Sequence, residues 1–148
     1  GNADFPRTHL SNAFSLAQLL VDKALEEGAI PLVQFHASPT AEKLSMGFML
    51  DGKAAAVIGT HTKVLSADGR ILKGGTAYIT DNGRCGSQRS VGGFDPTTEI
   101  EKHILQIPVR SQECWDDLAL VGVMVEISDE QKASSIEVVH IPVKNERT

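Results

Sequence analysis

The sequence predicts an α/β fold, a mixed sheet with flanking helices that ends in an antiparallel β-hairpin. Over residues 14–58, apolar side chains at helical spacing alternate with short apolar runs, which is the pattern of a sheet with crossover helices. Glycine-rich turns follow in the middle of the chain. Two longer apolar runs joined by a short polar connection come last, and this pattern is typical of a hairpin.

Residues 14–27 are predicted to form an amphipathic helix, because apolar side chains recur there at intervals of three and four residues. Ser11 or Asn12 can cap the start of this helix, and Gly28 lies just past its end. Residues 29–35 then form a short apolar run, which suits a buried strand.

A second helix and a second strand repeat this order. Ser38 is expected as the N-cap of the helix and Pro39 as its first residue. Asp51 and Gly52 end the helix, and residues 54–58 are the next candidate for a buried strand. Strands separated by helices in this way predict crossover connections within one sheet.

The second half of the chain changes character. Glycine dominates residues 81–94, which are predicted to form a loop. Asp95 and Pro96 then start a third helix by the same pattern of a cap followed by proline. Residues 118–127 and 136–143 are the two apolar runs expected to pair as the final hairpin.

Length and composition suit a single domain over residues 1–148. A net charge of −5 argues against a surface that binds nucleic acid. No apolar run approaches the roughly 20 residues needed to span a bilayer, and the first residues lack a signal-peptide pattern. A cytoplasmic location without membrane attachment is therefore expected. Cys85 and Cys114 lack CxxC spacing, so we expect two reduced thiols.

Two of the five histidines directly follow predicted strands. These are His36 and His61, and ligands of an open α/β sheet gather beyond the carboxyl ends of its strands. The two imidazoles can therefore share a metal or a phosphate. The alternative is a pair of polar loop residues brought together by topology alone, and spacing by itself favours it. His9, His103 and His140 are expected to be exposed or structural residues.

Several segments of the chain together carry a family resemblance. They are Phe35-His36-Ala37, Thr40-Ala41-Glu42-Lys43, Gly59-Thr60-His61-Thr62, Ala67-Asp68-Gly69-Arg70-Ile71-Leu72, Gly75-Thr76-Ala77-Tyr78-Ile79-Thr80-Asp81 and Ile107-Pro108-Val109-Arg110. These segments resemble the C-terminal half of the YmdB-like metallophosphoesterases, which belong to the calcineurin-like superfamily. The resemblance runs from about Arg7 to the end of the chain.

The resemblance implies half of a metallophosphoesterase αββα sandwich, with a two-metal phosphodiesterase site for Mn²⁺ or Fe²⁺. His36 and His61 would be metal ligands in that site. Where the family has a further histidine, two residues after His61, this chain has Lys63. An ammonium group carries no lone pair and cannot ligate a metal. Lys63, together with Thr60, is therefore expected to contact a phosphate.

The metal ligands that the family carries in its first half cannot be found in this sequence. Two histidines cannot supply the full ligand set of a two-metal site, so an incomplete or absent metal centre is expected. The function expected first is a non-catalytic interaction or scaffold domain. The alternative is a metal-dependent phosphodiesterase, acting on cyclic nucleotides or other phosphodiesters, whose site is completed by a missing N-terminal half or a second chain.

Half a sandwich also leaves the inner face of its sheet without a cover. Exposed apolar patches larger than a few hundred Å² are unusual on monomers and mark interfaces. The chain is therefore expected to form a homo-oligomer, or to bind a protein partner, through that face.

Overall fold

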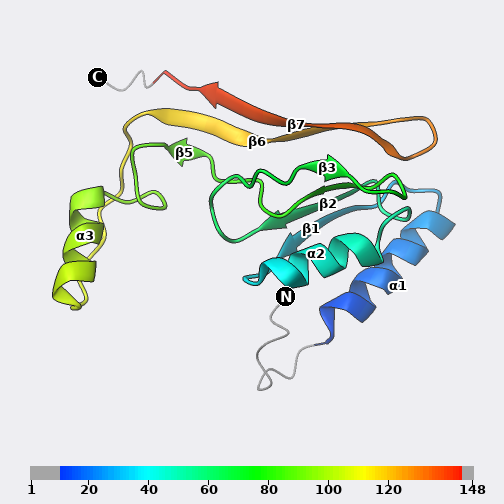
Figure 1. The fold of residues 1–148 in the computed structure, drawn as a ribbon, viewed down its shortest axis with the longest axis horizontal. Helices are drawn as coiled ribbons and strands as arrows, with labels where there is room; N and C mark the ends of the chain where they lie inside the picture. Colours follow the sequence, from blue (N-terminus) through cyan, green and yellow to red (C-terminus); the bar gives the residue numbers. More distant parts are fainter. Residues whose placement is uncertain (1–10, 145–148) are drawn as a thin grey trace. The chain divides into compact units, whose positions relative to one another are not determined.

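The structure is a computed structural model, and it describes residues 11–144 (Figure 1). The helices are α1 (Ala13–Glu26), α2 (Thr40–Met49) and α3 (Pro96–Leu105). The strands are β1 (Leu32–His36), β2 (Ala56–Thr60), β3 (Arg70–Ile71), β4 (Ala77–Ile79), β5 (Gly86–Ser87), β6 (Leu118–Ile127) and β7 (Ala133–Pro142).

The chain divides into two compact units. Of the described residues, the first unit contains 11–83 together with 123–138, and the second contains 84–122 together with 139–144. No helix within residues 11–144 is long and apolar enough to cross a membrane.

The first unit is built on a four-stranded mixed sheet with the strand order β1-β2-β4-β3. β1, β2 and β4 run parallel, whereas β3 is antiparallel to β4. The register pairs Phe35 with Gly59 and His36 with Thr60. Because β1 and β2 end at this register, their carboxyl ends lie side by side at one edge of the sheet.

Helices α1 and α2 cover one face of this sheet (Figure 1). Val57 and Tyr78 point toward the helices, where they join the buried cluster that contains Val21 of α1 and Met46 of α2. The helices come close to the strands, since a Cβ added at Gly47 would lie 2.5 Å from the ring of Tyr78. This packing holds α2 against the sheet, so its side chains reach the strand ends.

The opposite face of the sheet carries small side chains. Ala56 and Ala77 are buried there in a cluster with Ala133 of the hairpin, which Val125 also joins. The Ala133 amide donates to the carbonyl of Gly75 at 2.9 Å. The hairpin therefore covers the centre of this face.

Apolar side chains are exposed at strand β1. Leu32 is 64% exposed and Ile30, just before the strand, is 45% exposed. The sheet therefore presents an apolar surface at these two residues.

The second unit has little core of its own. β5 pairs antiparallel with β6, in a three-stranded sheet with the order β5-β6-β7. The Arg84 guanidinium donates to the Ser87 carbonyl at 2.6 Å and to the Ser90 hydroxyl at 3.0 Å, which shapes the glycine-rich loop. Helix α3 buries none of its residues.

The predicted elements are largely confirmed, including Asn12 and Asp95 as side-chain caps of α1 and α3. The cap predicted for α2 is wrong. Pro39 is the N-cap and no side chain caps the helix, because the Ser38 hydroxyl lies 3.0 Å from His61 Nε2 instead. The short strand β5 was not expected within the glycine-rich loop.

Candidate functional site

The two predicted metal ligands meet at the edge where β1 and β2 end. His36 is the last residue of β1, and His61 is the first residue after β2. Their ring centroids are 5.0 Å apart with the planes at 74°, and His61 Nδ1 lies 3.2 Å from His36 Nε2. The two imidazoles are therefore in contact at the edge of the sheet, as their places after neighbouring strands predict.

Hydroxyl groups hold the outer nitrogen of each imidazole. Thr60 Oγ1 lies 3.0 Å from His36 Nδ1, and Ser38 Oγ lies 3.0 Å from His61 Nε2. Either direction of proton donation satisfies the three contacts: from Ser38 through His61 and His36 to Thr60, or the reverse. In either direction each ring carries one N–H and one nitrogen with a lone pair, and the lone pair is what ligates a metal.

The loop after β2 has an unusual backbone. His61 has a φ of 119° and Lys63 has a φ of 63°. Residues other than glycine rarely adopt positive φ values. Backbone conformations of this kind persist only when the surroundings fix them, and they cluster at functional sites. Lys63 is exposed, two residues from the paired imidazoles.

A buried ion pair lies beneath this loop. Lys43 of α2 and Asp81, which follows β4, have side chains that are each 1% exposed, with Nζ and Oδ2 3.5 Å apart. Lys43 also donates to the Thr60 carbonyl at 3.3 Å. Asp81 accepts from the amides of Thr62 at 2.7 Å and Gly83 at 3.0 Å.

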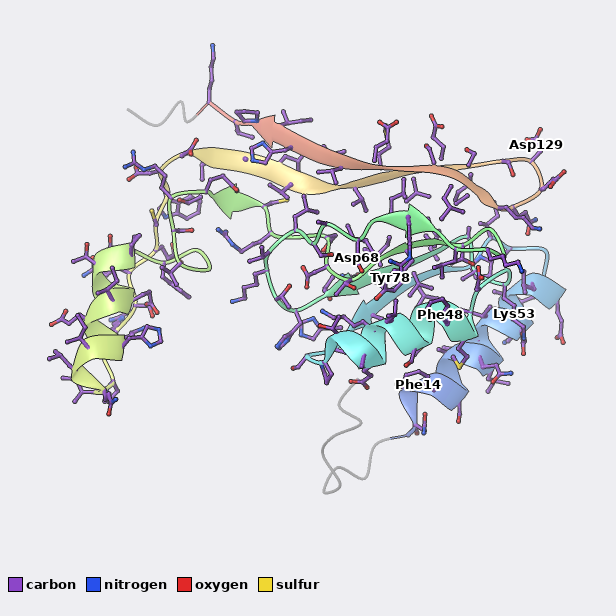
Figure 2. The ribbon with its side chains drawn as sticks, viewed as in Figure 1. Phe14, Phe48, Lys53, Asp68, Tyr78 and Asp129 are labelled. Carbon is purple, nitrogen blue, oxygen red and sulfur yellow. The ribbon has the colours of Figure 1, made fainter. Side chains whose placement is uncertain are left out.

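A second carboxylate supports the same loop. Asp68 accepts hydrogen bonds from the Thr80 hydroxyl and amide and from the Ser66 hydroxyl. Burial acts to raise the pKa of Asp68, but these hydrogen bonds outweigh it and hold the pKa below its ordinary value. Tyr78 bonds the Thr80 hydroxyl at 2.9 Å, and burial raises the pKa of its phenol. Figure 2 shows Tyr78 and Asp68 in the region of the four-stranded sheet.

The ends of β2 and β4 are pressed together at Gly59. A Cβ at this position would lie 1.9 Å from the Thr80 carbonyl oxygen and 3.0 Å from Lys43 Cδ. Only glycine fits such a close approach of two backbones. The contact brings the residues after β2 and those after β4 within reach of one another.

The structure places the sequence-predicted site residues in one small region. His36, His61 and Thr60 are in mutual contact, and Lys63 lies on the same loop. The Thr60 hydroxyl is bound to His36, so in this arrangement it positions a ring. Its predicted contact with a phosphate is still a prediction, as is that of Lys63.

Three residues that support the site escaped sequence reasoning. Lys43 and Asp81 stand 38 positions apart and show no charge pattern. Ser38 looked like a helix cap, because a serine before proline is a common start signal. The one sequence signal for Lys43 and Asp81 is that both lie in segments that resemble the YmdB-like family.

The residues fit a metal only in part. Two neutral imidazoles suit a transition metal as ligands. Within the described residues, however, no group of three or more His, Cys, Asp or Glu could hold a metal ion. The role of His36 and His61 as metal ligands therefore stays a prediction.

The sequence over residues 1–139 matches the family described as YmdB-like protein. The chain belongs to the YmdB-like family. This finding confirms the resemblance on which the fold and the site were predicted.

The relatives of this YmdB-like chain are phosphoesterases. It is 41% identical over 129 residues to a 2′,3′-cyclic-nucleotide 2′-phosphodiesterase of Bacillus subtilis (strain 168), covering 86% of this chain and 49% of the relative. It is 41% identical over 91 residues to a putative phosphatase/phosphodiesterase of Mycoplasma pneumoniae, covering 61% and 32%. Nothing in these relatives supports a scaffold role.

Solved structures confirm the fold class. A novel phosphatase from Mycoplasma pneumoniae has a TM-score of 0.82 at 31% identity, covering 98% of this chain and 52% of that one. A hypothetical protein from Thermus thermophilus has a TM-score of 0.83 at 27% identity, covering 96% and 54%. The YmdB-like chain thus has the predicted α/β architecture and spans about half the length of these relatives, or less.

Proposed function

We propose that this chain provides half of a metal-dependent phosphodiesterase site, which a further polypeptide segment completes. The observation that carries the proposal is the approach of His61 Nδ1 to His36 Nε2 at 3.2 Å, at the carboxyl edge of a parallel sheet. The names of the relatives support phosphoester hydrolysis. Their greater length supports a site with ligands from outside this chain.

His36 and His61 would hold the metal, which would polarise a phosphoryl oxygen and lower the pKa of a bound water. The hydroxyls of Thr60 and Ser38 fix the orientation of the two rings. Groups of this kind next to ligating histidines set the tautomer and raise ligand basicity.

Lys63 would contribute charge to substrate binding. Its ammonium is exposed on the loop that carries His61, and a lysine binds phosphate as a point charge. The substrate class we propose is a phosphodiester. A 2′,3′-cyclic nucleotide is the first compound to test, because a relative that is 41% identical bears that activity in its name.

Metal binding tests the remnant site directly. We expect chelator-stripped protein to bind Mn²⁺ in a calorimetric titration, and His36→Ala to weaken that binding at least tenfold. We expect this loss because the remaining imidazole, that of His61, cannot supply the coordinating nitrogen that His36 provides. His140→Ala, which removes a histidine from strand β7, is the matched control and is expected to bind as the unsubstituted chain does.

Activity is tested in a chimaera that joins this chain to the portion of the Bacillus subtilis relative outside the match. The chimaera is expected to hydrolyse 2′,3′-cyclic nucleotides with Mn²⁺, and His61→Ala is expected to lower kcat at least a hundredfold. A folded, metal-binding chimaera without activity would contradict the proposal. That result would favour the scaffold interpretation instead.

A further inference from the structure

The buried pair of Lys43 and Asp81 contacts the backbone on both sides of His61. Lys43 Nζ donates to the carbonyl of Thr60, the residue before His61, at 3.3 Å. Asp81 Oδ2 accepts from the amide of Thr62, the residue after it, at 2.7 Å. We infer that this ion pair is a positioning device that holds His61 against His36.

A stabilising role alone does not account for the pair. Buried ion pairs contribute little to stability, because desolvation of the two charges offsets their attraction. Here both side chains are 1% exposed, and each spends further hydrogen-bonding capacity on the backbone of the His61 loop. These contacts therefore explain the conformation of the His61 loop better than they explain the stability of the core.

The backbone of His61 needs such a support. Its φ of 119° is strained, and it would relax if the residues on either side were free to move. One member of the pair comes from α2, which packs on a face of the sheet, and the other follows β4, which pairs with the edge of β2. Fixing residues 60 and 62 from two elements determines the direction in which the His61 ring points.

The inference rests on the proposed function for its purpose, but the position of the ring can be measured without any activity. Long-range ¹H–¹⁵N spectra report the protonation and hydrogen bonding of each ring nitrogen. The signals of His36 and His61 are assigned with His36→Gln and His61→Gln. The test variant is Lys43→Met with Asp81→Asn, which removes both charges together and leaves no charge unpaired.

Asp51 provides a matched control. Its carboxylate accepts from the amides of Gly74 at 2.8 Å and Thr76 at 3.4 Å, before β4 begins, whereas Asp81 lies after β4 ends. Asp51→Asn removes the same kind of support at the far end of the same strand. Asp81→Asn alone is the second test variant, for use if the double variant does not fold.

We expect the test variants to change the His61 ring signals and to weaken Mn²⁺ binding by roughly 10–100-fold, the range for residues that orient metal ligands. Asp51→Asn is expected to lower the melting temperature without either change. Unchanged His61 signals in a folded test variant would overturn the inference, and so would equal changes in Asp51→Asn. Failure of the unsubstituted chain to bind Mn²⁺ would overturn the proposed function, while the ring signals would still decide the inference.

Discussion

His61 shows most clearly what a single residue contributes here. Its φ of 119° lies outside the conformations that side chains favour, and the strain costs about 1–3 kcal/mol. No sequence pattern indicates this strain, because the residues around His61 resemble those of any polar loop. The sequence predicted only that His61 follows a strand.

Lys63 is the clearest departure from the family pattern, and it can be reversed. We expect Lys63→His to raise the affinity for Mn²⁺ about tenfold, because an imidazole supplies the lone pair that an ammonium lacks. Calorimetric titration measures the change. Lys63→Gln removes the charge without adding a ligand, and an equal gain in that variant would contradict the explanation.

Asp68 predicts a pH dependence of stability. Its folded pKa lies below the ordinary value, so the charged form stabilises the fold above about pH 4 and this contribution is lost as the pH falls through the folded pKa. Asp68→Asn should therefore lower the free energy of unfolding by about 1 kcal/mol at pH 7. Urea titrations at pH 7 and pH 3 should show the difference shrinking; a constant difference would exclude this cause.

Among the elements, those with local signals were predictable. Asn12 caps α1 with hydrogen bonds to two amides, and Asp95 with Pro96 begins α3, as their sequence patterns indicated. The strand β5 has only two residues, which is too short to show a periodic pattern. Gly86 and Ser87 form a strand by pairing with β6. Non-local pairing of this kind leaves no trace in a short sequence window.

The approach of α2 to the sheet predicts a sharp response at one glycine. Gly47→Ala should destabilise the protein by about 1–3 kcal/mol, because the new Cβ would lie 2.5 Å from the Tyr78 ring. Gly122→Ala is the control, since nothing lies within 4 Å of a Cβ there. Chemical denaturation measures the free energy of unfolding of both variants. Equal losses in the two would show that backbone propensity, and not packing against Tyr78, causes the destabilisation.

For the whole molecule, the incomplete cover of the sheet remains the main consequence of half a fold. We propose that the exposed surface at Leu32 and Ile30 pairs with another copy or another protein. Light scattering at high micromolar concentration should give a mass above 15.9 kDa. Leu32→Asp is expected to restore the monomer, and a monomeric mass for the unsubstituted chain would contradict the proposal.

The division into two compact units has a spectroscopic consequence. The chain has one tyrosine and one tryptophan: Tyr78 is fully buried in the first unit, and Trp115 is 59% exposed in the second. Each unit therefore carries its own intrinsic fluorophore. Selective excitation of the Trp115 indole reports the unfolding of the second unit. The absorbance of the Tyr78 phenol reports the unfolding of the first unit. Whether the two melt together can thus be determined in a single heating experiment, without any label.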